Sequence, residues 1–322
     1  MRELSAGHLM PLCVFDIFPD GTTQVPSDTA LTGPGAYRWW HFDISNQEFP
    51  EWATKRLAEI PAQALMQPET RPRCDQYEDG LILNLRGINL NEGQDTDQMV
   101  SVRMWVEDRA LITVRVRRVF AIEEIRTLAE AQKAPATPAA FLEALINRLT
   151  TRIQTEVQSI GKLTQFYEDD LDDQDTKPPK DLPDVRRSVI RLRRYLEPQR
   201  AALKQLAVLD LPLIPAPDGL RLRELANRTT IAVEELDALK ERLITVQEEH
   251  DQHVANQQAR HGYVLSLAAA VFLPLGFLTG LFGVNIAGMP GMQSPNAFWI
   301  LCAGMIGLAF VMLGILRLFR WF

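Results

Sequence analysis

The sequence predicts an α+β domain, then long helices, then two C-terminal transmembrane α-helices, and two observations support this fold class. The 322 residues are 23% charged, yet no Asp, Glu, Lys, Arg or His occurs from Gly262 to Leu316. Short runs rich in β-branched and aromatic residues fill the first part, whereas the part after Pro138 shows helical spacing with few strand signals. The predicted divisions are therefore 1–135, 136–261 and 262–322.

A small sheet flanked by helices is expected in the first part. Amphipathic spacing predicts helices over Glu48–Glu59 and Ile122–Ala131. Glu107-Asp108-Arg109 is short enough to be a hairpin turn between the last two of the predicted strands. Those strands, five runs with partial alternation, are Pro11–Phe18, Arg38–Ile44, Leu81–Leu90, Met99–Val106 and Ala110–Val116.

Three long helices follow, separated by proline-rich breaks. The first is expected over Ala139–Leu171 and the second over Leu182–Leu209. The third begins near Asp218 and meets no Pro or Gly between Leu220 and His261, so it has no stop signal before the apolar end. Continued to Phe282 it would be roughly 90 Å long, with a bend possible at Gly262 and a kink possible at Pro274.

The charge-free end contains two apolar runs, Tyr263–Val284 and Ala297–Leu318. Each has about the 20 residues that a helix needs to cross the bilayer. A buried hairpin of a soluble protein is the alternative, but two adjacent charge-free runs of this length are rare in soluble cores. Both ends of the pair are basic and the connecting loop is uncharged, which predicts a multi-pass membrane protein with cytoplasmic N- and C-termini. The basic residues are Arg260, His261, Arg317 and Arg320.

Composition excludes several classes of function. The net charge of −7 gives no basic footprint for nucleic acid. The three cysteines lie far apart, so they indicate neither a disulfide framework nor a thiolate zinc site. No P-loop, GxSxG, HExxH or dinucleotide motif is present, and so no enzymatic chemistry and no cofactor is predicted. A membrane-anchored enzyme of unrecognised type and a tethered sensor or scaffold stay open as alternatives.

Two helices per chain cannot enclose a water-filled path, so a transporter of this build must be a homo-oligomer. Gly276 and Gly280 form a GxxxG pair that lets helix backbones approach closely. The alternative is that these glycines pack only the two spans of one chain against each other.

At the end of the first span the sequence reads GLFGVNIAGMPG from Gly280 to Gly291, preceded by Phe272-Leu273-Pro274-Leu275 and Phe277-Leu278-Thr279. These residues resemble the CorA superfamily of divalent-cation transporters, whose members carry a Gly-Met-Asn or similar triplet at this place. The variant Gly283-Val284-Asn285 resembles the zinc-transporting ZntB branch. The motif resemblance covers about the last sixty residues, and the preceding part agrees in the order of its elements.

The resemblance implies a funnel-shaped homopentamer in the cell inner membrane that takes up Zn²⁺, and the related ions Ni²⁺, Cd²⁺ and Co²⁺, coupled to the proton gradient. The spans contain no carboxylate or histidine for a proton relay. The outer loop lacks the acidic residues that many magnesium-type members carry, which favours zinc, but a CorA-type Mg²⁺ channel stays the alternative. The family's pore-facing track corresponds approximately to Leu265, Ala269, Leu273, Gly276 and Thr279.

A ring of Asn285 amide oxygens would recognise a hydrated divalent ion without trapping it, because neutral dipoles bind such an ion weakly. Gly283 would let the chain turn out of the helix. The alternative is that Asn285 is only a helix C-cap.

Two cytosolic clusters are further candidates. His250 and His253, three residues apart on a helix and next to Asp251, are spaced to share a zinc ion. Ordinary polarity of an exposed helix is the alternative. A second cluster of six carboxylates is either a cation-attracting patch or a solvated acidic face. Its residues are Glu168, Asp169, Asp170, Asp172, Asp173 and Asp175.

Overall fold

The computed structural model describes residues 11–171, 179–284 and 294–318. The chain divides into two compact units between Gln247 and Glu248. The first unit contains the sheet together with most of the long-helix region, and one apolar core joins strands and helices within it. The three divisions expected from the sequence therefore stay a prediction, since residues before and after position 135 share that core.

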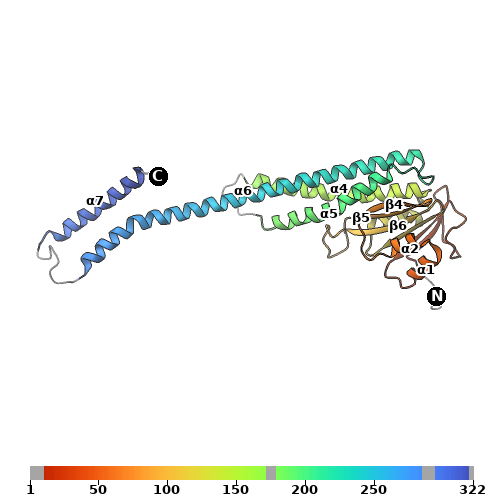
Figure 1. Cartoon of the computed structure of the whole chain (residues 1–322), viewed down its shortest axis with the longest axis horizontal. Coiled ribbons are helices and arrows are strands. Elements are labelled where there is room, and N and C mark those ends of the chain that lie inside the picture. Colours follow the sequence, from red (N-terminus) through yellow and green to blue (C-terminus); the bar gives the residue numbers. More distant parts are fainter. Residues whose placement is uncertain (1–10, 172–178, 285–293, 319–322) are drawn as a thin grey trace. The chain divides into compact units, whose positions relative to one another are not determined.

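The first unit contains a mixed seven-stranded sheet, in which Figure 1 labels β4, β5 and β6. The strand order is β2-β1-β3-β7-β6-β5-β4. Neighbouring strands are antiparallel except for β3 and β7, which pair in parallel. All five predicted strands are confirmed, and β2 and β4 are additional. The strands are β1 (Cys13–Ile17), β2 (Thr23–Gln24), β3 (Tyr37–Asp43), β4 (Arg73–Tyr77), β5 (Gly80–Gly87), β6 (Val100–Val106) and β7 (Ala110–Arg115).

The predicted hairpin turn between β6 and β7 is present. The Glu107 amide donates to the Ala110 carbonyl at 2.8 Å, and Val106 lies opposite Leu111 in the register. Alternation in these two strands sends successive side chains to opposite faces, so each face acquires its own apolar layer.

Helices cover both faces of the sheet. α1 (Phe49–Arg56) and α2 (Glu59–Met66) pack against the face that carries Trp40, Phe42 and Trp105. α3 (Phe120–Glu130) and the long helices cover the other face. The single helix predicted over Glu48–Glu59 is wrong in its end: Leu57 adopts an extended conformation, with φ −116° and ψ 156°, and stops α1 there.

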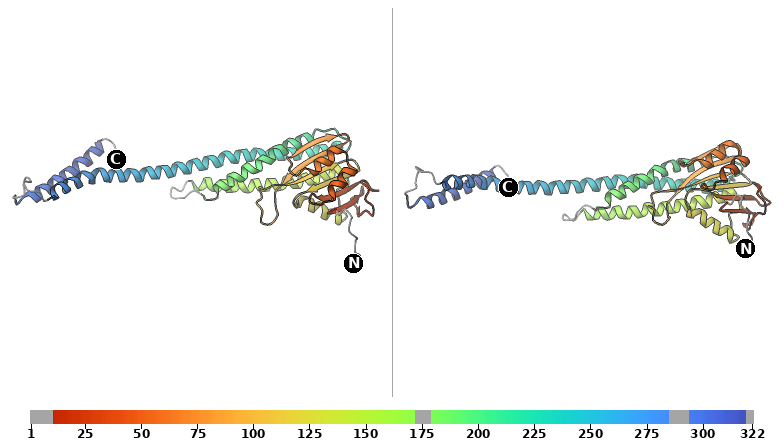
Figure 2. Two further views of the ribbon diagram at one scale, coloured as in Figure 1. Left: turned by 60° about the horizontal axis from the view of Figure 1, so that its bottom comes forward. Right: turned by 90° about the horizontal axis from the view of Figure 1, so that it is seen from below.

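Three long helices run side by side in the first unit: α4 (Pro138–Asp170), α5 (Leu182–Leu206) and the N-terminal part of α6 (Ala216–Gly283), as Figures 1 and 2 show. Thr137 caps α4, its hydroxyl accepting from the Ala140 amide at 3.1 Å. Phe141, Leu149 and Val157 recur at helical spacing along α4 and are buried. Hydrophobic burial along these seams therefore stabilises the three-helix packing.

The second unit holds the rest of α6 and α7 (Ala297–Leu318). The 68 residues of α6 form one helix, so Gly262 does not end it. Pro274 lies inside α6, where it removes the hydrogen bond that its amide would have donated. The sequence prediction of one helix from the cytosolic part into the first apolar run is confirmed.

Candidate functional site

Two helices are long and apolar enough to cross a membrane, the last part of α6 and the whole of α7. Their apolar side chains point outward in the single chain: Leu265 is 73% exposed, Leu273 76% and Phe277 68%. Soluble monomers rarely expose a contiguous apolar surface of this extent. Lipid or further copies of the chain must therefore cover it.

The partly buried residues of both spans recur at helical spacing, which indicates that the two helices face each other along one side. In α6 they include Leu267, Val271 and Leu278, and in α7 they include Met305 and Met312. The face of α6 that looks away from α7 is thus left for other molecules. The predicted pore-facing residues are all exposed and belong to that remaining surface; they are Leu265, Ala269, Leu273, Gly276 and Thr279.

The GxxxG glycines have open space around them. A Cβ atom built on Gly276 or Gly280 would meet no other atom within 4 Å among the residues that the structure describes. Packing of the chain's own two spans therefore does not explain why these positions are glycine. A close approach by another helix would explain it.

The predicted pore mouth falls where α6 ends. Gly283 is the last residue of the helix and Val284 follows it, 48% exposed. Asn285 lies outside the described residues, so its role stays a prediction. One turn before the end, the Thr279 hydroxyl donates to the carbonyls of Leu275 and Gly276 at 3.1 and 3.0 Å. Its oxygen keeps lone pairs that can accept from the water shell of an ion.

The predicted zinc cluster on α6 consists of His250, Asp251 and His253. His250 is 4% exposed, whereas Asp251 and His253 are exposed. Within the three described ranges, no group of three or more His, Cys, Asp or Glu side chains is placed to hold a metal ion. A zinc site formed by these residues in one chain thus gains no support.

The predicted acidic patch is partly neutralised. Glu168 is paired with Arg242, whose Nε donates to Glu168 Oε1 at 2.7 Å, and this hydrogen bond lowers the pKa of the carboxyl. Asp169 is exposed and Asp170 half-buried. Asp172, Asp173 and Asp175 lie outside the described residues. An ion-paired carboxylate attracts cations less, so the patch is weaker than its six carboxylates suggest.

Comparison with known proteins decides the family. The model of one protein family, described as CorA-like Mg²⁺ transporter protein, matches residues 34–318. The chain belongs to this family. As a CorA-like divalent-cation transporter it carries the transmembrane helices typical of the group at its C-terminus.

The relatives of this chain include a CmaX protein and a ZntB protein. The divalent cation transporter CmaX of Pseudomonas aeruginosa is 33% identical over 88% of this chain and 87% of that protein. The zinc transport protein ZntB of Pectobacterium carotovorum subsp. carotovorum is 34% identical over 82% of this chain and 81% of the relative. The resemblance to the CorA superfamily and to ZntB proteins is confirmed.

Solved structures agree with the fold. The full-length CmaX protein matches with a TM-score of 0.85 and 31% identity, over 98% of this chain and all of that chain. The CorA magnesium transporter of Methanocaldococcus jannaschii matches with a TM-score of 0.78 at 15% identity, which concerns the fold alone. The expected fold class, an α+β domain with long helices and two C-terminal spans, is confirmed.

Sequence reasoning missed one further cluster. Several arginines from distant segments meet at a pocket beside the sheet. In the sequence, only the run Arg191-Leu192-Arg193-Arg194 indicated a cluster of arginines, and such a run is typical of any solvent-exposed helix face. Its other members become neighbours only through the fold.

Proposed function

We propose that this CorA-like protein transports Zn²⁺, together with Ni²⁺, Cd²⁺ and Co²⁺, into the cell through a homopentameric pore in the inner membrane. The observation that carries the proposal is the similarity to ZntB proteins over four-fifths of both chains, combined with a first span that ends at Gly283 and is followed in the sequence by Val284-Asn285. The uncharged loop lies outside and both termini lie in the cytoplasm, because the basic residues flank the pair of spans.

The pore is lined by the exposed face of α6. Its aliphatic side chains offer no ligands, so an ion passes with its water shell, and dewetting of the same surface can close the path. At the outer end, symmetry turns Asn285 into a ring of amide oxygens that holds the hydrated ion weakly. The open space at Gly276 and Gly280 supports this assembly, because five α6 helices must approach one axis closely.

Coupling to the proton gradient is part of the proposal. The charge-free stretch Gly262–Leu316 contains no carboxylate or histidine. A proton must therefore travel through water in the pore, or titrate a group outside the spans.

Flux measured in proteoliposomes tests substrate and coupling together. Purified chain reconstituted into vesicles should take up Zn²⁺, and an imposed pH gradient, acidic outside, should increase the rate. Competition with Mg²⁺ examines the alternative substrate, which the description of the family model favours. Zinc-impermeable vesicles that conduct Mg²⁺ would establish the alternative, and vesicles impermeable to every divalent ion would leave a tethered sensor or scaffold.

A matched pair of variants tests the pore mouth. Asn285→Ala should change zinc flux, whereas Asn296→Ala removes the same side chain at the other end of the same loop and should leave flux near the wild-type rate. Equal effects of the two substitutions would remove Asn285 from the selectivity site.

A further inference from the structure

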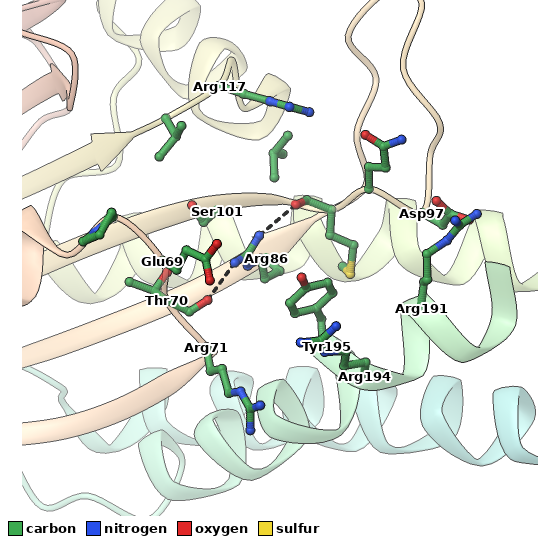
Figure 3. A pocket seen from close by; sticks show the side chains of 15 residues that line it. Glu69, Thr70, Arg71, Arg86, Asp97, Ser101, Arg117, Arg191, Arg194 and Tyr195 are labelled. Carbon is green, nitrogen blue, oxygen red and sulfur yellow. Dashed lines mark hydrogen bonds and ion pairs between the residues drawn. The ribbon is translucent and has the colours of Figure 1, made fainter. Parts of the chain in front are cut away.

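A pocket of about 730 Å³ opens beside the sheet in the first compact unit (Figure 3). Its walls come from the segment before β4, from β5 and β6 with the loop between them, from the segment after β7, and from α5. This volume lies within the range of pockets that hold small organic ligands.

The pocket is basic although the chain is acidic. The whole chain has 34 Lys and Arg against 41 Asp and Glu, so the excess of positive charge here is local. Within the described ranges, Arg191 alone among the lining arginines has a carboxylate partner, with its Nη2 2.6 Å from Asp97 Oδ2. The lining contains five arginines, Arg71, Arg86, Arg117, Arg191 and Arg194, and two carboxylates, Glu69 and Asp97.

Arg86 holds a fixed charge at the centre of the wall. Its Nη1 donates to the Met99 carbonyl at 2.9 Å and its Nη2 to the Thr70 carbonyl at 2.7 Å, as Figure 3 shows. Its guanidinium also lies 4.5 Å from the centre of the Tyr195 ring. Its Nε is buried and has no hydrogen-bond partner in the part of the chain that the structure describes. Neutral carbonyls orient the group, and burial lowers the pKa of Arg86 more than the Glu69 carboxylate raises it.

A second guanidinium, that of Arg103, lies close to that of Arg86. Arg103 is fully buried on β6, and its Nη2 donates to the carbonyl of Pro68, a residue of the pocket lining, at 2.9 Å. Its Nε and Nη1 have no partner among the described residues. Burial, and then the nearby charge of Arg86, lower the pKa of Arg103 to about 10. Arg103 is buried and Arg86 half-buried, and neither forms an ion pair among the described residues, so the pair favours an anion nearby, because an anion offsets their desolvation cost.

The outer arginines surround Arg86. Figure 3 shows Arg71 and Arg117 on opposite sides of it. Both are exposed, and Arg117 Nη1 donates to the Gln94 side chain at 2.9 Å. Guanidinium groups bind phosphate oxygens in a planar, two-pronged geometry, and groups arranged around a centre are reached together only by a ligand with several anionic oxygens.

We propose that this pocket binds a phosphorylated anion that carries two or more adjacent phosphate groups. The Tyr195 ring already contacts the guanidinium groups of Arg86 and Arg194, so recognition depends on the phosphates rather than on stacking of a base. The site lies in the first unit and is independent of the transport proposed above.

Titration calorimetry on the full-length chain in detergent, with EDTA present, tests the proposal. The probes are sodium tripolyphosphate, pyrophosphate, orthophosphate and chloride. Tripolyphosphate and pyrophosphate should bind, and orthophosphate should bind at least about tenfold more weakly, because each lost charge-assisted contact is worth that order of affinity. Binding should weaken as salt is raised.

Two double variants separate the pocket from overall charge. Arg71→Ala with Arg194→Ala removes two exposed pocket arginines and should weaken tripolyphosphate binding by about tenfold or more. Arg187→Ala with Arg221→Ala removes the same charge from exposed sites outside the pocket, where the side chains are 64% and 65% exposed, and should bind like the wild type. Thermal midpoints without ligand verify that both variants are folded.

Four results would overturn the proposal: no binding of tripolyphosphate to the wild type, equal affinity for orthophosphate or chloride, unchanged binding in the pocket variant, or equal loss in both variants. A pocket variant that changes the number of chains per particle would also overturn it, because the pocket arginines would then serve a contact between copies. None of these results depends on zinc flux, so failure here is distinct from failure of the transport proposal.

Discussion

Removal of the Asp16 carboxylate should destabilise the sheet strongly, because the buried guanidinium of Arg38 then loses its only buried ion-pair partner among the described residues. Asp16 on β1 lies opposite Arg38 on β3 in the register, with Nε–Oδ1 at 2.6 Å and Nη2–Oδ2 at 2.8 Å. The Arg38 side chain is 0% exposed and that of Asp16 3%. Breaking a buried pair costs about 3–5 kcal/mol. Arg38 keeps Asp28 and the Ala30 carbonyl as acceptors, which places Asp16→Ala near the lower end.

For a unit of this size, about 3 kcal/mol corresponds to a fall of roughly 6–12 °C in the unfolding midpoint. Tryptophan fluorescence of the detergent-purified chain measures this midpoint, because Trp39 and Trp40, which follow Arg38 in the sequence, are buried and become exposed on unfolding. Asp28→Ala is the control: that carboxylate contacts the same guanidinium but is 59% exposed, so its loss should matter much less. A midpoint for Asp16→Ala within about 2 °C of wild type, or equal shifts in the two variants, would refute a dominant role for the buried pair.

Three further predictions follow from single residues. Burial lowers the pKa of His41 from 6.5 to about 3, so between these two pH values only the unfolded chain binds this proton. The free energy of unfolding should therefore fall by about 1.4 kcal/mol for each pH unit below 6.5, until the pH reaches about 3. Denaturant titrations of His41→Asn should show a shallower dependence of this free energy on pH. A Cβ on Gly276 meets no other described atom within 4 Å, so Gly276→Leu should reduce the number of chains per particle in native mass spectrometry by obstructing another helix; an unchanged number would contradict a helix contact there. A Cβ on Gly80 would lie 2.3 Å from Trp105 Cη2, so Gly80→Ala should lower the melting midpoint. Gly161 is the matched control: it lies in mid-helix, and its Cβ would be 3.9 Å from Leu239, so Gly161→Ala should add about 1 kcal/mol to the free energy of unfolding and raise the midpoint.

Local patterns carried most of the fold prediction. The β-branched and aromatic runs that became β3, β5 and β6 bury nearly every side chain, so their composition reflected their burial. β4 was missed for the opposite reason: Arg73–Tyr77 is an edge strand with one fully buried side chain, Cys74, and reads as polar. Its pairing depends on β5 rather than on its own sequence.

Some candidate sites could likewise be predicted from local sequence, whereas others depend on contacts between distant segments. The end of α6 at Gly283 could be predicted, because a charge-free run, glycine spacing and a short motif coincide there. The arginine pocket could not, because Arg71, Arg86 and Arg117 stand before, within and after different strands. The pairing of Glu168 with Arg242 was equally hidden, since the two residues lie on different helices.

The parallel pairing of β3 with β7 constrains how the sheet can be assembled during synthesis. It joins β2-β1-β3 to β7-β6-β5-β4, and its partners are separated by roughly 70 residues of chain. At a synthesis rate of about 5–20 residues per second, β7 is completed on the order of 4–15 seconds after β3. During that time the aromatic edge of β3, Tyr37–Asp43, is open to other strands. Nascent chains arrested before Ala110 should therefore be the ones that recruit chaperones most strongly.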